Sequence, residues 1–265
     1  MIYNIFLKQP NGKNALSISN NSETWSIIEN IELWLEEYFT KCKCHNRIYY
    51  NDAVLNEHVD SYNAHAKGIL VYDDKTIKWL IHSVPNWPSE TFKFNSIIYG
   101  QSFILMELPI IKLKNIIDHL EIMDVNIYYN TTPFTFIKSL NKLDICEISQ
   151  NIYHIAKSKE WYKDLFDDEL SDLFGGNIAA ETWMRPVNKD TQYVNNIEEI
   201  KWPNGIIYSE SQDHSKYCFS LNKDKPWVFI GDINHQASQS KRGGGGIMIK
   251  NITLWNAFYS LIAKL

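Results

Sequence analysis

The sequence has few cysteines and no hydrophobic run long enough to cross a membrane. Only four cysteines occur in 265 residues, too few and too unevenly spaced for the dense disulfide framework of a small secreted domain. A reducing compartment is therefore allowed. No stretch approaches the roughly 18 apolar residues of a membrane span, and Lys8 interrupts the N-terminal segment before it reaches the length of a signal peptide. We expect no membrane partner, and a chain that is cytoplasmic or exported without a classical leader.

An excess of positive charge is also absent. The chain has 26 Lys and Arg against 31 Asp and Glu, a formal net charge of −5. This excludes a generally basic nucleic-acid-binding protein, so any contact with DNA must use a local positive groove. The eight histidines shift the charge toward positive on acidification, so affinity for a polyanion is expected to rise as the pH falls.

The apolar content is sufficient for a large core. Hydrophobic residues make up 45% of the chain and aromatic residues 14%, so disorder is not expected. The length fits one large domain or two closely packed halves. Because no domain boundary is evident, we predict one unit over residues 1–265, with an N-terminal half of about 1–140 and a C-terminal half of about 141–265.

Two H-x-K tripeptides, one in each half, carry the chemistry. H-A-K at 65–67 and H-S-K at 214–216 lie 149 residues apart (214 − 65), and each opens an apolar run typical of a strand. Residues i and i+2 of a strand point to the same face, so each histidine and its lysine can face one spot. If the two pairs converge, two imidazoles and two ammonium groups surround one phosphate.

Such a cluster suits phosphodiester hydrolysis without a metal or cofactor. One imidazole would attack phosphorus and form a phosphohistidine. The other would protonate the leaving oxygen and then deprotonate the water that frees the product. Lys67 and Lys216 would neutralise the non-bridging oxygens. Cys42, Cys44 and His45 form a local cluster of possible metal ligands, but no second ligand pair has a convincing spacing, so we predict no metal site.

The hydrophobic patterning predicts a mixture of strands and helices, hence an α/β or α+β fold. Ser26 and Glu29 fit a capping box at the start of a helix. Residues 186–210 are expected to form a long surface connection, and residues 241–246 a glycine-rich loop that either approaches a phosphate or is merely flexible. The other expected strands cover 2–8, 15–19, 47–50, 65–73, 79–83, 97–106, 125–129, 216–220 and 227–234, and the other helices 111–120, 160–174 and 255–263.

Several longer strings around the tripeptides resemble deoxyribonuclease II, a branch of the phospholipase D superfamily. They occur in the same order as in that family and extend, more weakly, over nearly the whole chain. The strings are H-A-K-G-I-L-V-Y-D (65–73), W-L-I-H-S-V-P-N-W-P (79–88), Y-G-Q-S-F (99–103), D-H-S-K-Y-C (213–218), P-W-V-F-I-G-D-I-N (226–234) and R-G-G-G (242–245).

The resemblance implies a phospholipase D-like fold, in which two similar halves pack their sheets together, helices cover the outside and one active site lies at the seam. It also implies a metal-independent endonuclease that acts on double-stranded DNA, favours acidic pH and leaves 3′-phosphate ends. Family members can pair into a clamp around the duplex, so a homodimer is possible, and the animal members are lysosomal.

The resemblance also implies roles for individual residues. The catalytic pairs carry over to His65 with Lys67 and to His214 with Lys216. By analogy with the superfamily, His65 is expected to be the nucleophile and His214 the general acid, with the reverse assignment left open. The polar position after the first pair falls on Ser83, and its counterpart after the second pair falls on Asn234.

Four further positions are expected to contact substrate. Ser83, Gln101 and Asn234 would donate to phosphate oxygens or orient a histidine, or else serve as turn and strand-end caps. Arg242 would bind the DNA backbone without sequence preference. The chain departs from the family at His235, where arginine is common.

Two other classes of function compete with a DNA endonuclease. One is a phosphodiesterase acting on RNA or a phospholipid, although no amphipathic basic helix supports the lipid version. The other is a non-catalytic DNA-binding relative. The intact histidine–lysine pairs speak against it, because binding alone does not require two imidazoles.

Overall fold

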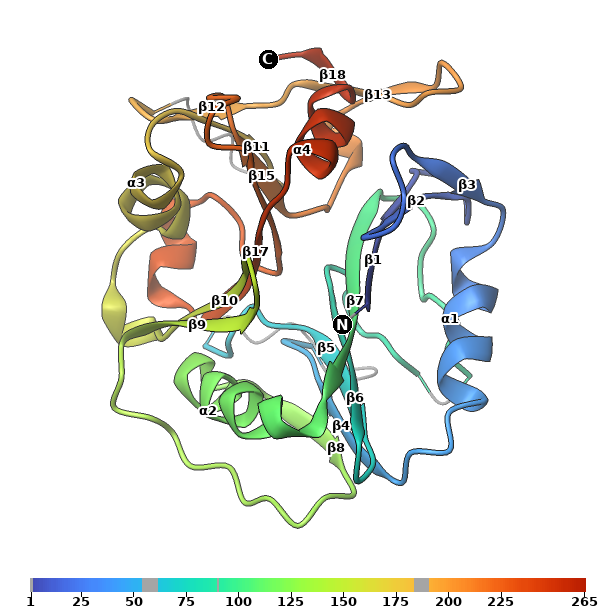
Figure 1. Ribbon diagram of the computed structural model, residues 1–265, viewed down its shortest axis with the longest axis vertical. Coiled ribbons are helices and arrows are strands. Elements are labelled where there is room, and N and C mark those ends of the chain that lie inside the picture. The colour runs from blue at the N-terminus through green and yellow to red at the C-terminus, as the bar shows by residue number, and fades with distance from the viewer. Residues whose placement is uncertain (1, 54–61, 90, 184–190) are drawn as a thin grey trace.

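A computed structural model of the chain describes residues 2–53, 62–89, 91–183 and 191–265. Two large sheets stand side by side, and each is built mainly from one half of the sequence (Figure 1). Both combine with short helices, so the predicted mixed α/β class is confirmed. Among the described residues, no helix is both long and apolar enough to span a membrane.

The first sheet has the strand order β3-β2-β1-β7-β6-β5-β4-β8. All of its strands come from the first half of the chain. They are β1 (Ile2–Lys8), β2 (Ala15–Ser19), β3 (Ser26–Ile28), β4 (Asn46–Tyr50), β5 (Gly68–Tyr72), β6 (Thr76–His82), β7 (Gln101–Pro109) and β8 (Ile127–Asn130).

The second sheet has the order β12-β11-β15-β16-β17-β10-β9, and a small third sheet has the order β14-β13-β18. The second sheet consists of β9 (Leu143–Ser149), β10 (Ile152–Lys157), β11 (Ile178–Glu181), β12 (Val194–Asn196), β15 (Tyr217–Ser220), β16 (Trp227–Gly231) and β17 (Gly244–Lys250). The third consists of β13 (Glu199–Lys201), β14 (Ile207–Ser209) and β18 (Ile262–Lys264).

The helices divide the core into layers. α1 (Ile31–Thr40) covers the outer face of the first sheet, and α3 (Ser171–Phe174) lies on the outer face of the second (Figure 1). α2 (Leu113–Met123) and α4 (Ile252–Tyr259) contribute to the central core between the two sheets. Within the described ranges, the central core is the largest of three buried clusters, and the other two lie under α1 and α3.

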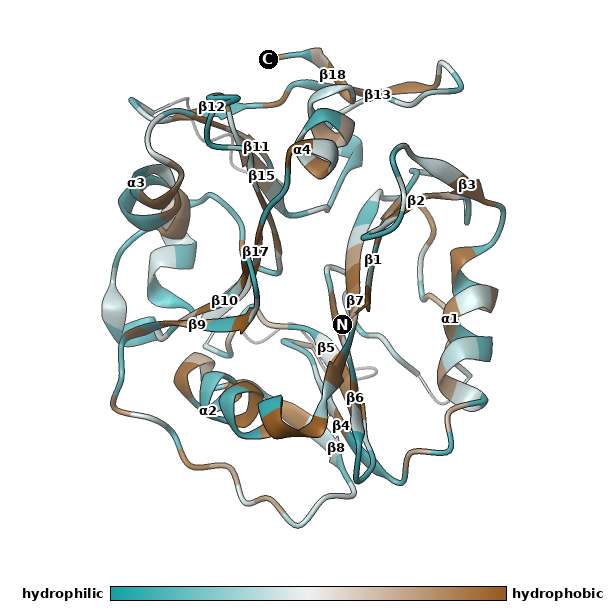
Figure 2. Cartoon of the chain, in the orientation of Figure 1, coloured by the Kyte–Doolittle hydropathy of each residue, from teal (hydrophilic) through white to brown (hydrophobic). Residues whose placement is uncertain are grey.

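The central strands are buried on both faces. In β5, Leu70 faces the central core while Ile69 and Val71 face the cluster under α1. A strand covered on both sides reads as a continuous apolar run rather than an alternating one, which is why this segment was predicted as a strand from its composition. Figure 2 shows the same feature, with hydrophobic colouring along the central strands and hydrophilic colouring in most connecting loops.

Two predictions around the helices are wrong. Ser26 lies in the edge strand β3 rather than at a helix start, and Asn30 caps α1 instead, accepting a hydrogen bond from the Leu33 N–H at 3.0 Å. The helix predicted over 160–174 is broken into a 3₁₀ turn, a π-helical turn over Phe166–Leu170 and the short α3. The Asp164 carboxylate caps the backbone of this π-helical turn.

The expected surface connection over residues 186–210 is also largely wrong, because its described part supplies β12, β13 and β14. Residues 186–190 of that prediction lie outside the described residues.

In the expected loop over 241–246, Gly244, Gly245 and Gly246 instead start strand β17. A Cβ atom added to Gly245 would collide with the carbonyl of Ile155 on β10, and one added to Gly246 would collide with the Gly231 backbone on β16. Glycine is therefore required here for close approach of three strands rather than for flexibility.

Candidate active site

Both H-x-K tripeptides lie immediately before a central strand. Lys67 precedes β5 and Lys216 precedes β15. The Lys67 carbonyl accepts the His82 N–H at 3.1 Å, and the Lys216 carbonyl accepts the Gly231 N–H at 2.9 Å. Each lysine is thus placed by the neighbouring strand of its own sheet.

The main chain of each histidine is bonded to the opposite half of the molecule. The His65 N–H donates to the carbonyl of Gly243 at 2.8 Å, and the His214 N–H donates to the carbonyl of Gly100 at 2.9 Å. These two hydrogen bonds bring the two tripeptides to the same seam between the sheets.

The His65 ring has a defined tautomer. Its Nδ1 is hydrogen-bonded to the backbone carbonyl oxygen of Asp232. A carbonyl can only accept, so Nδ1 carries the hydrogen and Nε2 keeps a lone pair. Nε2 lies 3.7 Å from Oδ2 of Asp52. Burial and the charge of Lys67 lower the pKa of His65 well below its ordinary value, which keeps the ring neutral.

Asp52 is a central residue of the site that the sequence analysis missed. Its Oδ1 lies 2.8 Å from Nζ of Lys67 and its Oδ2 lies 3.1 Å from Nη2 of Arg242. Burial alone would raise the pKa of Asp52, but the charges of Lys67 and Arg242 lower it below its ordinary value. The carboxylate is therefore ionised and binds two cations at the seam. No local sequence signal marks it, because its partners lie far along the chain.

The His214 ring is enclosed by aromatic side chains. It stacks on Tyr99 with ring centroids 4.0 Å apart and contacts Trp183 at 4.3 Å. Its Nε2 is buried and has no hydrogen-bond partner in the described part of the chain. Burial first, then the charges of Lys216 and Lys67, lower the pKa of His214 to about 3.

The two lysines are nearly inaccessible, each 2% exposed. Burial, followed by the charge of Lys67, lowers the pKa of Lys216 to about 7. The charge of Lys216 also lowers the pKa of His65, behind larger effects of burial and Lys67, and that of Lys67 lowers the pKa of His214. The two imidazoles and two amines therefore act on one another within a single electrostatic environment.

The four predicted substrate contacts lie in different surroundings. The Ser83 hydroxyl donates to Oε1 of Gln101, so these two meet. Arg242 is buried, with Nε donating to the Asn63 carbonyl at 2.9 Å, beside its pairing with the Asp52 carboxylate. Asn234 is 4% exposed, and its Oδ1 has no hydrogen-bond partner among the residues described.

Asp232 and Ser102 also contact the backbone of this site. The Asp232 carboxylate accepts the Gly245 N–H at 2.9 Å and a hydrogen bond from the Lys67 backbone. Burial raises the pKa of Asp232 to about 7. Ser102 Oγ accepts the N–H of Lys216 at 3.0 Å. The Asp232 side chain thus holds the backbone of Lys67, and the Ser102 side chain holds the backbone of Lys216.

The spacing of the chain contained a signal for Asp232. It follows His214 by 18 residues (232 − 214), as Ser83 follows His65 (83 − 65). Ser83 Oγ accepts the Ser102 N–H on the next strand at 2.9 Å, and Asp232 makes the matching bond with Gly245. The position matching Ser83 is therefore Asp232 rather than Asn234.

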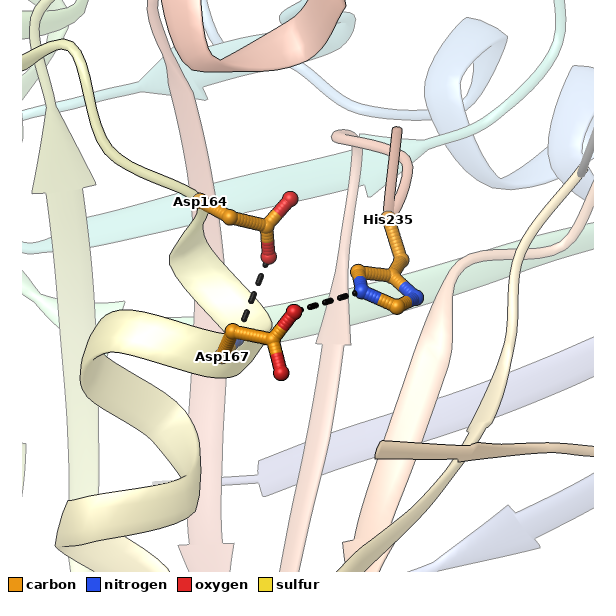
Figure 3. Close-up of side chains that lie close together, drawn as sticks. All are labelled: Asp164, Asp167 and His235. Atoms are coloured by element: carbon orange, nitrogen blue, oxygen red, sulfur yellow. Dashed lines mark hydrogen bonds and ion pairs between the residues drawn. The ribbon is translucent and has the colours of Figure 1, made fainter. Parts of the chain in front are cut away.

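One group outside the seam could offer ligand atoms to a cation. Asp164, Asp167 and His235 place one ligand atom each within 4.8 Å of one another (Figure 3). His235 Nε2 lies 2.9 Å from Asp167 Oδ2, and Asp164 caps the adjoining turn. These interactions account for the group as a structural cluster. The four cysteines are free thiols.

Comparison with known proteins identifies the family. The deoxyribonuclease II family model matches residues 8–265. Deoxyribonuclease-2 of Caenorhabditis elegans is 29% identical, covering 97% of this chain and 74% of that protein. Deoxyribonuclease-2-beta of Mus musculus is 30% identical over 81% of this chain and 69% of that protein.

Among solved structures, polyphosphate kinase from Porphyromonas gingivalis aligns with a TM-score of 0.35 and 13% identity, covering 74% of this chain and 32% of that chain. This similarity is too low to assign a fold.

The mixed α/β fold, its buried imidazoles and amines at the seam, and these matches define a hydrolase of the nuclease class. The chain belongs to the deoxyribonuclease II family, and the predicted resemblance is thereby confirmed.

Proposed function

We propose that the chain is a metal-independent endonuclease that hydrolyses double-stranded DNA through a phosphohistidine and leaves 3′-phosphate ends. One observation carries this proposal: the main chain of each histidine is hydrogen-bonded to the opposite half of the molecule, so both H-x-K tripeptides lie at one seam, while His65 keeps Nε2 free of hydrogen. A nucleophile, an acid and two cations then face one phosphate, which is the set of groups the reaction requires.

In the first step, the Nε2 lone pair of His65 forms a bond to phosphorus. The bond from phosphorus to the 5′ oxygen breaks, and the proton on the His214 ring passes to that oxygen. Lys67 and Lys216 neutralise the charge that gathers on the non-bridging oxygens. The product of this step is a phosphohistidine that carries the 3′ side of the cut strand.

In the second step, His214 removes a proton from water, and the water oxygen attacks phosphorus. The bond from phosphorus to Nε2 breaks, so His65 returns to its neutral form and the strand ends in a 3′-phosphate. His214 is then protonated and ready for the next cycle. The general acid of the first step thus acts as the general base of the second.

Acidic pH favours this cycle. His214 has a pKa of about 3 without substrate, so it is mostly neutral near pH 7. A bound phosphodiester places a negative charge beside the ring and raises the pKa of His214. Lower pH increases the protonated fraction further, whereas the lowered pKa of His65 keeps the nucleophile neutral.

We further propose that the fold is phospholipase D-like, with two repeated halves of about 1–140 and 141–265 in one domain. In support, the strand order β1-β7-β6-β5 of the first sheet is matched by β10-β17-β16-β15 in the second. Lys8 and Lys157 end β1 and β10 and are also 149 residues apart (157 − 8), the spacing that relates the two histidines.

A plasmid-nicking assay in EDTA over pH 4–8 tests the proposal. Cleavage by the intact chain, strongest at acidic pH, with 3′-phosphate ends, supports it. His65→Ala and His214→Ala should each abolish turnover on DNA, and a ³²P-labelled substrate whose leaving group needs no protonation should label His214→Ala but not His65→Ala. Binding without cleavage would favour a non-catalytic relative, and activity only on RNA or phospholipid would favour another phosphodiesterase.

We also propose that two copies of the chain pair around the duplex, as the family resemblance implies. Size-exclusion chromatography with light scattering, with and without a short duplex, tests this pairing. A mass of one chain without the duplex, and of one chain plus one duplex with it, would exclude a homodimeric clamp.

A further inference from the structure

We infer that Lys8 and Lys157 are positioning residues, each of which orders the loop whose glycine carbonyl binds the main chain of the histidine in the opposite half. This inference rests on the proposed histidine mechanism and extends it to two residues outside the H-x-K tripeptides. Both lysines are fully buried, and neither faces a carboxylate at ion-pair distance among the residues described.

Lys8 ends strand β1 and points its ammonium group at backbone carbonyls. Nζ donates to Gln9 O at 2.8 Å, Gly12 O at 2.9 Å and Ile97 O at 3.0 Å. The three donors of an ammonium group are thereby satisfied. One of these carbonyls belongs to the loop that leads into β7 and contains Gly100.

Lys157 ends strand β10 and makes the same arrangement in the second sheet. Nζ donates to Gln239 O at 3.0 Å, Ser240 O at 3.2 Å and Arg242 O at 2.7 Å. All three carbonyls belong to the segment that leads into β17. The residue that follows Arg242 is Gly243.

These loops are the ones that bind the histidines. Gly100 follows Ile97 by three residues (100 − 97) and accepts the His214 N–H, while Gly243 accepts the His65 N–H. Lys8 therefore acts on His214, and Lys157 acts on His65. A second bond strengthens the first connection, because the Gly100 N–H donates to Gln212 O at 2.8 Å, just before His214.

Burying an ammonium group costs desolvation free energy, so its use to stabilise a loop indicates that the position of the loop matters. Burial lowers the pKa of both Lys8 and Lys157 to about 8. An apolar side chain would fill the same space without that cost, but it would leave three carbonyls without donors. One ammonium group therefore holds three backbone carbonyls in a single geometry, and with them the loop that binds the histidine.

Substitutions of Lys8 and Lys157 should have different effects, because the histidines that they position have different roles. We compare Lys8→Met and Lys157→Met on DNA and on thymidine 3′-(p-nitrophenyl phosphate), whose leaving group needs little protonation. With wild-type protein, a rapid burst of p-nitrophenol reports phosphohistidine formation. Lys157→Met should lose the burst, because His65 is misplaced.

Lys8→Met should keep the burst and yet lose about 100-fold in kcat on DNA, with little change in KM, because misplacing an acid or nucleophile by ~1 Å costs about that factor. Lys8→Gln and Lys157→Gln repeat the comparison if a methionine variant does not fold. Ile18→Ala, a core truncation on β2, controls for lost stability.

The outcomes separate this inference from the mechanism on which it rests. If wild type shows neither a burst nor a ³²P-labelled protein, the proposed function fails. If wild type shows a burst and both lysine variants match Ile18→Ala, or lose the two activities in parallel, the positioning inference is overturned. If instead Lys8→Met loses the burst and Lys157→Met keeps it while losing kcat on DNA, the positioning inference is supported and His214 is the nucleophile.

Discussion

The Asp52 carboxylate lies 2.8 Å from the ammonium group of Lys67, and both side chains are buried. Its second oxygen pairs with Arg242, which comes from the other half of the chain. A single carboxylate therefore connects the first H-x-K tripeptide to the segment that leads into β17. In the substrate-free site it also offsets the positive charge that would otherwise gather around His65.

Removing this carboxylate should destabilise the fold. Asp52→Ala leaves the Lys67 and Arg242 charges buried without an anionic partner, which costs about 3–5 kcal/mol. Urea unfolding at pH 7 measures the loss. Asp74→Ala, an exposed carboxylate on the β5–β6 turn, should change the unfolding free energy by less than about 0.5 kcal/mol. A similar small change for Asp52→Ala would show that the pairing contributes nothing to stability.

Arg242 and its neighbour Lys241 should affect DNA binding differently. Lys241 is exposed, so Lys241→Ala should weaken binding and reduce the slope of log K against log salt concentration by about one phosphate contact. Arg242 is enclosed by Asp52 and Asn63, so Arg242→Ala should lower the unfolding free energy instead.

Fluorescence anisotropy from 50 to 300 mM salt, together with urea unfolding, separates the two effects. An Arg242→Ala protein with normal stability and a reduced salt slope would restore the surface-contact role expected from the sequence.

Local patterns predicted the parts of the fold that depend on local physics. The continuous apolar run of β5 and the i, i+2 spacing of His65 and Lys67 are both visible in a short window of sequence. The edge strand β3 and the cap at Asn30 were missed because Ser26 and Glu29 fit a capping box, which is a pattern that also starts helices. Only the pairing of β3 with β2 decides between them.

Long-range contacts determined what the sequence could not predict. Asp52 is indistinguishable from a strand-end aspartate until Arg242 is folded against it. The glycines of β17 resemble a loop, because glycine weakens a strand in isolation. Their role depends on how closely β10 and β16 approach, which no local pattern encodes. The equal spacing of Ser83 and Asp232 from their histidines was readable, but required comparing the two halves position by position.

The aromatic enclosure of His214 should set the pH range of activity. Tyr99→Ala removes the ring stacked on the imidazole at 4.0 Å and admits water. Since burial is the main cause of the lowered pKa of His214, that pKa should rise. In the proposed mechanism a higher pKa keeps the acid protonated to higher pH, so the alkaline inflection of kcat should move up by about one pH unit.

The position of this inflection is independent of the overall rate, which also falls if the ring is less well placed. Single-turnover rates on DNA between pH 4 and 8 give it directly. Tyr259→Ala, which removes a half-exposed ring on α4, should leave the inflection unchanged. If Tyr99→Ala also leaves it unchanged, His214 is not the acid that limits the rate.

A buried histidine pair should make the fold sensitive to acid. Nδ1 of His119 and Nδ1 of His154 lie 2.6 Å apart between α2 and β10, so only one of these nitrogens can carry a hydrogen. Burial lowers the pKa of both rings, whereas in the unfolded chain each titrates near about 6.5. The unfolded state therefore binds more protons below that pH, and stability falls as the pH falls, by about 1.4 kcal/mol per pH unit for each histidine that stays neutral.

Urea unfolding at pH 7.5, 6.5, 5.5 and 5.0 measures this slope. The double variant His119→Gln with His154→Gln should flatten it by the contribution of up to two protons, about 2.8 kcal/mol per pH unit. His45→Gln, on an exposed histidine, should leave it unchanged. An unaltered slope in the double variant would show that the pair does not couple folding to pH. If the slope flattens, acid inactivation of the nuclease should shift to lower pH in the same variant, because unfolding, and not protonation of the nucleophile His65, limits activity at the acidic end.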